Sequence, residues 1–191
     1  MYAQQSTVML EATTTFAEGR LTEAEEACAR LLTDRPVDSA AWHLGGQIAL
    51  AMDRGKVGVA RLSKSVELAP GNIGYQNALA TTLLRVGDTT GAHAACAAAI
   101  ALAPDAAALH CTLGLIFSRQ GRWADAEAPL RRAIQLDPRL GSAHTFLATA
   151  LASLSRLPEA MSVAEAAAAL LPNDPVVKLL IGQISAARNE P

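Results

Sequence analysis

The chain has 191 residues, of which 51% are hydrophobic and only 4% aromatic, and its net charge is −2. Such a balanced charge excludes the strongly basic surface that proteins use to bind nucleic acids or anionic membranes. Alanine, the strongest helix former, supplies much of the apolar content, so the composition favours helices over strands.

Prolines recur along the chain at a fixed spacing of 34 residues: Pro36, Pro70, Pro104, Pro138 and Pro172. A constant period over most of a chain indicates an internal repeat. We number each repeat so that its proline is position 32. Position 8 is then always small: Ala12, Gly46, Ala80, Gly114, Ala148 and Gly182. So is position 20: Ala24, Gly58, Ala92, Ala126 and Ala160. Helices approach closely where side chains are small, so each repeat is predicted to be two antiparallel helices, the second of which stops before the proline.

The period predicts five repeats and a final helix in chain order. They span residues 5–38, 39–72, 73–106, 107–140 and 141–174, followed by a capping helix over 175–188. Asp174 and Pro175 are residue types that favour a helix start. Each repeat is expected to bury its apolar side against its neighbours, which predicts a single domain over residues 1–191. The helices of repeat 39–72 are expected to be weak, because each interior glycine costs ~1 kcal/mol relative to alanine.

Repeat 107–140 shows the pattern most fully. It carries Leu113-Gly114, Phe117, Gly121, Trp123, Ala126, Ala133 and Asp137-Pro138. With the period and the small positions, this resembles the tetratricopeptide repeat family. The resemblance covers about residues 5–174 and a further half repeat, and implies an all-α, right-handed superhelical solenoid of antiparallel helix pairs. Glu11 and Thr15 depart from the pattern, since large apolar residues are usual at their positions.

The sequence contains none of the motifs that mark a catalytic centre, a phosphate-binding loop or a paired-cysteine metal site. We therefore expect no enzymatic activity and no cofactor. His110 and His144 share position 4 of adjacent repeats, which leaves two interpretations: a metal- or pH-sensing column, or large packing residues, as Trp42 is in repeat 39–72. We favour packing, and expect no metal. Three isolated cysteines favour a reducing compartment, and hence the cytoplasm, while the high alanine and arginine content hints at a bacterial source.

The family resemblance implies that the first helix of each repeat lines a concave, peptide-binding groove. Carrying the family's groove positions over gives these candidates: His43, Gln47, Asn77, Thr81, Arg85, Cys111, Leu115, Arg119, Thr145 and Thr149. Arg85 and Arg119 share position 13 of adjacent repeats, so they are expected to lie side by side and to grip a carboxylate of the partner. The alternative is that both are ordinary surface arginines. The lysine and asparagine pattern of the family's chaperone-tail clamp is absent.

The final helix carries more apolar residues than one buried face needs. Val177, Ile181 and Ile184 suit that face, whereas Val176, Leu179 and Leu180 spread around the rest of the helix. The latter three predict a contact with a second copy of the chain or with another domain. No segment is long and apolar enough to span a membrane, so no membrane insertion is expected.

The sequence therefore predicts a non-catalytic scaffold or adaptor that binds a protein or peptide, with an acidic group as one feature of the partner, and that binds no nucleic acid. Two alternatives remain open. The chain could be the substrate-recruiting region of a larger bacterial enzyme, such as a glycosyltransferase, sulfotransferase or hydroxylase, or a scaffold that assembles with itself.

Overall fold

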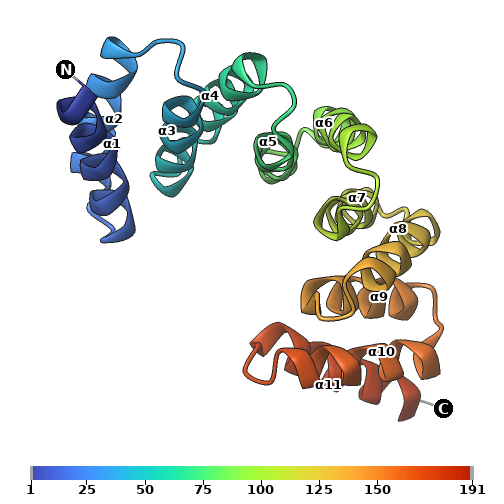
Figure 1. Ribbon diagram of the computed structural model, residues 1–191. Coiled ribbons are helices and arrows are strands. Elements are labelled where there is room, and N and C mark those ends of the chain that lie inside the picture. Colours follow the sequence, from blue (N-terminus) through green and yellow to red (C-terminus); the bar gives the residue numbers. More distant parts are fainter. Residues whose placement is uncertain (1, 190–191) are drawn as a thin grey trace. The chain divides into compact units, whose positions relative to one another are not determined.

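The computed structural model describes residues 2–189, which form eleven helices and no strand (Figure 1). The helices are α1 (Tyr2–Ala17), α2 (Leu21–Asp34), α3 (Ser39–Ala51), α4 (Gly55–Leu68), α5 (Ile73–Arg85), α6 (Thr89–Leu102), α7 (Ala107–Arg119), α8 (Trp123–Leu136), α9 (Gly141–Ser153), α10 (Leu157–Leu170) and α11 (Pro175–Asn189). The all-α class is confirmed. Two helices fall within each predicted repeat, and α11 occupies the predicted final segment.

The chain divides into two compact units, unit 1 (Met1–Ala95) and unit 2 (Cys96–Pro191), with the division inside α6. Within unit 1, α1 packs on α2, α2 on α3, α3 on α4 and α4 on α5. Within unit 2, each helix from α7 to α11 likewise packs on the next. The single domain over residues 1–191 stays a prediction, and its residues 1, 190 and 191 lie outside the described residues.

Every first helix ends in the same tight turn, because position 15 adopts a left-handed backbone. The five residues and their φ angles are Gly19 (76°), Asp53 (57°), Gly87 (89°), Gly121 (71°) and Ser155 (62°). The next residue then donates its backbone N–H to the carbonyl five residues earlier, as Arg54 does to Ala49 at 2.8 Å. This bond defines a Schellman motif, which satisfies carbonyls at the helix end and reverses the chain.

Two glycines of repeat 39–72, Gly46 and Gly58, lie where its two helices cross. A methyl group on Gly46 would come within 2.6 Å of Leu62, and one on Gly58 within 2.7 Å of Leu50. Each would also lie close to the other glycine's carbonyl oxygen, at 3.4 and 3.3 Å. These glycines lower the helix propensity of α3 and α4, but they also have a packing role, because only glycine lets the two helices approach so closely.

In three repeats the side chain at position 4 of the first helix is hydrogen-bonded to the turn before that helix. Trp42 Nε1 donates to the carbonyl oxygen of Pro36 at 2.8 Å, and Gln76 Nε2 to that of Pro70 at 3.3 Å. His110 Nε2 makes the equivalent bond to Pro104 at 2.7 Å. Three different side chains thus fasten the start of a helix to the preceding proline turn. Among the described residues no group of three or more His, Cys, Asp or Glu side chains could hold a metal ion.

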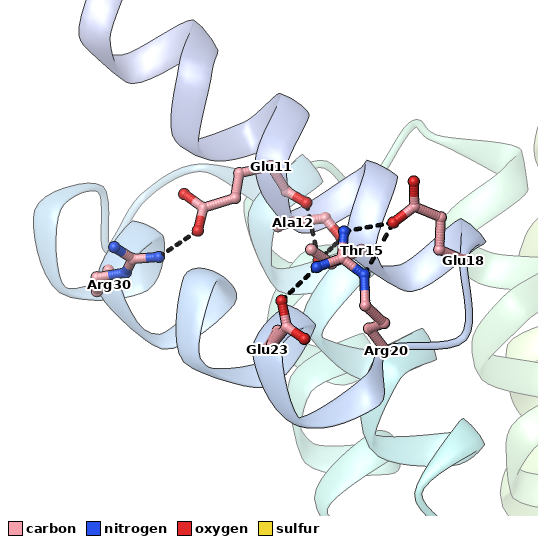
Figure 2. Close-up of polar contacts among 7 residues, drawn as sticks. All are labelled: Glu11, Ala12, Thr15, Glu18, Arg20, Glu23 and Arg30. Carbon is pink, nitrogen blue, oxygen red and sulfur yellow. Dashed lines mark hydrogen bonds and ion pairs between the residues drawn. The ribbon is translucent and has the colours of Figure 1, made fainter.

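The two departures in repeat 5–38 each find a polar partner (Figure 2). Thr15 is 5% exposed, and its hydroxyl donates to the carbonyl of Glu11 at 2.8 Å. The Glu11 carboxylate pairs with Arg30 of α2 at 2.7 Å, on the exposed surface. Arg20, at the start of α2, lies between the carboxylates of Glu18 and Glu23. The Glu11–Arg30 ion pair therefore joins α1 to α2, whereas Thr15 is satisfied within α1.

Candidate peptide-binding face

In unit 1 an aromatic pair joins the first helices α3 and α5, which carry the predicted groove residues. The His43 ring of α3 stacks on Tyr75 of α5, with centroids 4.6 Å apart and planes 24° from parallel. Burial lowers the pKa of His43. Gln47 and Thr81 are exposed and Asn77 is half-buried. These side chains offer a neutral surface at neutral pH.

Arg85 is held by the end of the neighbouring first helix. Its Nη2 donates to the carbonyl oxygen of Leu50, in the last turn of α3, at 2.7 Å. The same carbonyl also accepts the backbone N–H of Asp53 at 3.1 Å. A cation there complements the negative end of the helix dipole. The remaining donors of its exposed guanidinium could still bind a carboxylate. Sequence reasoning missed this bond to α3.

Arg119 is exposed at the end of α7 in unit 2 and makes no ion pair with the described residues. Unlike Arg85, it has all five guanidinium donors to offer. Because the two arginines belong to different units, a joint grip on one carboxylate stays a prediction.

Two candidates of unit 2 have little surface to offer a ligand. Cys111 and Thr145 are each only 6% exposed. The Thr145 hydroxyl donates to Gly141 within α9 at 3.1 Å, and the Cys111 sulfur lies 3.7 Å from the Ser142 hydroxyl. The structure corrects our expectation that these two side chains line an open surface. Leu115 and Thr149 are half-buried, so they remain partly accessible.

The threonines at position 9 bond to their own helices. Thr81 Oγ1 donates to the carbonyl of Asn77 at 3.0 Å, and Thr149 Oγ1 to that of Thr145 at 2.9 Å. The hydroxyl hydrogens are therefore engaged, whereas the oxygen lone pairs remain as acceptors. Such a threonine can accept an N–H from a ligand but has no proton to donate.

Thr149 borders a hollow of about 270 Å³ between α9 and α11. We call it the α9–α11 hollow, and it is lined by Thr149, Ala152, Ser153, Leu157, Leu180, Gln183, Ile184 and Ala187. None of these side chains is charged. Ser153, Gln183 and Ala187 share positions 9 and 13, from which groove candidates were taken, whereas Leu157 and Ile184 do not. The repeat positions therefore identified about half of this lining.

The final helix differs in part from expectation. Val176 and Leu179 are exposed, at 59% and 62%. Leu180 was expected with them but is only 7% exposed, and belongs to the apolar core of unit 2 with Ile184. Ile181, expected to be buried, is only half-buried. The helix is thus rotated so that Leu180 faces α9 and α10. No described helix has the length and apolarity needed to cross a bilayer.

Comparison with known proteins gives a family. A profile of the tetratricopeptide repeat matches residues 77–140 and 111–175, which together make up more than half of the chain. The chain belongs to the tetratricopeptide repeat family. No curated protein sequence matches this tetratricopeptide chain.

Solved structures share its fold at low sequence identity. The tetratricopeptide protein TTC0263 of Thermus thermophilus superposes with a TM-score of 0.77 at 21% identity, over 95% of this chain and 99% of that one. PilF of Pseudomonas aeruginosa gives 0.82 at 14% identity, over 96% and 84% of the two chains. YrrB, described as having an unusual peptide-binding site, gives 0.67 at 15% identity, over 87% and 86%. At these identities the likeness shows a tetratricopeptide solenoid fold.

Proposed function

We propose that this tetratricopeptide chain is a non-catalytic scaffold that holds an extended segment of a partner protein in the α9–α11 hollow. The proposal rests chiefly on the hollow itself, a concave site of about 270 Å³ on the helices that carry the predicted groove positions. It is near the lower end of the size range of ligand pockets, so it suits one or two side chains of a longer segment.

The lining of the hollow suits a peptide. Leu157 provides apolar contact for an aliphatic side chain, and the largely buried Leu180 and Ile184 form the floor of the hollow. The exposed Gln183 amide both donates and accepts, and Thr149 can accept an N–H. An extended backbone needs both kinds of partner, and it directs alternate side chains to opposite sides. The absence of charge in the lining favours an uncharged residue inside the hollow.

An acidic group elsewhere on the partner would suit Arg119. Its exposed guanidinium can bind a carboxylate with two parallel hydrogen bonds. Arg85 belongs to unit 1 and is partly engaged by α3, so it is the weaker candidate for this contact. An acidic residue outside the hollow thus belongs to the proposed motif.

The test uses a variant that fills the hollow. Peptides selected for binding from a display library of random sequences would be titrated by fluorescence anisotropy against the wild type, Ala152→Trp and Ala169→Trp. Ala152 lines the hollow, whereas Ala169 is exposed on α10 outside it. We expect Ala152→Trp to weaken binding at least about tenfold, about 1.4 kcal/mol, and the matched control to bind as the wild type. Equal binding by all three proteins would contradict the proposal.

A second candidate function, self-assembly, is favoured by the exposed Val176 and Leu179 of α11. Such side chains on an end helix are suited to packing against a second copy. The test is light scattering of the wild type and Leu179→Lys over a range of concentrations. A dimer that Leu179→Lys dissociates would support it, and a wild type that stays monomeric at the highest concentration would exclude it.

A further inference from the structure

Unit 2 has a second cavity, of about 330 Å³, that shares no lining residue with the α9–α11 hollow. We call it the α8–α10 cavity. Its lining comes from α8 (Arg131, Ile134, Gln135), α9 (His144, Leu147) and α10 (Ser162, Val163, Ala166). Its volume is within the range of small-molecule and side-chain pockets. It combines apolar side chains with several polar groups.

Small residues of α10 contribute to this opening. Position 26 of the second helix holds a long cation in three other repeats, namely Arg30, Lys64 and Arg132, but holds Ala166 here. Ser162 and Ala166 are both exposed. Ile134, Val163 and the buried Leu147 then form apolar walls. A ligand with a flat apolar body could bury most of its surface between them.

His144 departs from the bond that position 4 makes elsewhere. Trp42, Gln76 and His110 each bond to the carbonyl of the proline six residues before them. The equivalent partner of His144 would be Pro138, but its ring contacts Leu140 instead, through Nδ1 at 3.2 Å. The ring therefore bonds to the end of the proline turn through Nδ1 and not to the proline itself, and it contributes to the cavity lining.

The contact with Leu140 determines what the other ring nitrogen can do. A carbonyl oxygen only accepts, so Nδ1 must carry the hydrogen in that bond. In the neutral ring, Nε2 is then left as an acceptor. No described residue donates to it. The α8–α10 cavity thus has a hydrogen-bond acceptor without a partner within the chain.

The charge of Arg131 is already compensated. Its guanidinium pairs with Glu127 of α8 at 2.9 Å and with Glu159 of α10. Arg156 pairs with the same two carboxylates, at 2.6 Å to Glu127. Two arginines and two glutamates form a closed ring of ion pairs at this edge of the cavity. An anionic ligand would have to compete with these carboxylates, so a neutral ligand is favoured.

We propose that the α8–α10 cavity binds a neutral aromatic side chain that carries a hydrogen-bond donor, namely a tyrosine or tryptophan of a partner protein. The ring packs between Ile134, Leu147 and Val163, and its O–H or N–H donates to His144 Nε2. This contact lies outside the α9–α11 hollow, so it is independent of the proposed peptide site.

Two small probes of nearly the same shape test the inference. p-Cresol has the phenol of tyrosine, and toluene lacks only its hydroxyl. Both would be titrated into the full chain at about pH 8, where an ordinary histidine is neutral, with binding followed by methyl NMR at Leu147 and Val163. We expect p-cresol to bind in roughly the millimolar range. Toluene should bind about fivefold more weakly, because a net hydrogen bond is worth about 1 kcal/mol.

The nitrogen signal of His144 Nε2 gives a direct readout that needs no variant. It should shift with p-cresol and stay unchanged with toluene. His144→Phe should abolish the preference for p-cresol, and Ala166→Trp should abolish binding of both probes, whereas Ala169→Trp should bind as the wild type. Equal affinity of the two probes for the wild type would overturn the inference. So would an unchanged Nε2 signal, or chemical shift changes confined to other parts of the chain.

Discussion

The carboxylate of Glu25 accepts two hydrogen bonds from the guanidinium of Arg61, at 2.7 and 2.8 Å, although the residues belong to different repeats. Both side chains are largely buried, at 17% and 16% exposure. Arg61 also donates to the carbonyl of Gly45 at 3.0 Å. Arg54, at the start of α4, binds the same carboxylate at 3.1 Å. One glutamate of α2 thus joins the first repeat to the second.

Removing the charge of Glu25 should destabilise unit 1 in a pH-dependent way. The hydrogen bonds from Arg61 lower the pKa of Glu25 from its ordinary value. The resulting stability is present above the unfolded-state pKa and is lost as the pH falls through the folded-state pKa. Glu25→Gln should therefore lower the free energy of unfolding by about 1–3 kcal/mol at neutral pH, and by less in acid. Urea unfolding at several pH values measures this difference.

The matched control for Glu25 is Glu67→Gln. Glu67 pairs with Lys64 on the exposed surface, where an ion pair contributes about 0–1 kcal/mol. The two variants should differ clearly at neutral pH. If Glu25→Gln is no more destabilising than the control, the buried pair does not stabilise the junction of the two repeats.

Adding a methyl group at position 8 should have opposite effects at two glycines. On Gly114 it would lie 2.4 Å from Leu130, so Gly114→Ala should destabilise the chain by about 1–3 kcal/mol. On Gly182 it would meet nothing within 4 Å, so Gly182→Ala should stabilise by up to about 1 kcal/mol through helix propensity. Chemical denaturation of both variants tests the prediction. A stabilising Gly114→Ala would disprove the close helix crossing.

Replacing the turn residue Ser155 by glycine should stabilise the folded chain. Its φ of 62° is left-handed, which costs roughly 1–2 kcal/mol for a residue with a side chain. Ser155→Gly should therefore raise the free energy of unfolding by about 1 kcal/mol. Ser153→Gly, inside α9, is the control and should be neutral or destabilising. Thermal unfolding measured by circular dichroism distinguishes the two, and equal shifts would argue against strain at the turn.

The cysteines should be unreactive in the folded protein. Burial raises the pKa of Cys28 and of Cys96 to about 11, and raises that of Cys111 as well. Since the thiolate is the reactive form, labelling by a disulfide reagent near pH 8 should be slow until denaturant is added. All three thiols should then react. Rapid labelling of any one without denaturant would show that its helix opens locally.

The sequence predicted the helices well because their ends depend on local residues. Prolines stop the second helices, and a small residue at position 8 determines where two helices cross. The side of α11 that is buried was harder to predict. Position 6 is 7% exposed at Leu44 and Thr112 but 65% exposed at Leu10, so this column gives no consistent signal that Leu180 is buried. The expectation placed Ile181 on the buried face with Val177 and Ile184.

The binding residues were predicted less well because they depend on contacts between repeats. Arg85 can bond to Leu50 only because the end of α3 lies next to it in the fold, and residue spacing does not predict that placement. The two cavities depend on the volumes left between three helices, and their linings include exposed alanines such as Ala166 and Ala187. Alanines in a helix-rich sequence carry no local signal of a binding site, so sequence reasoning passed over them.

Gly182 has a consequence for protein engineering. In two complete repeats the glycine at position 8 packs against a leucine of the second helix: Gly46 against Leu62 and Gly114 against Leu130. Gly182 occupies the same position, but its surroundings are open. A grafted helix with leucine in the equivalent place, such as a copy of residues 123–136, could dock on α11 without any change to α11 itself. We therefore expect that the chain can be lengthened by repeats copied from its own sequence.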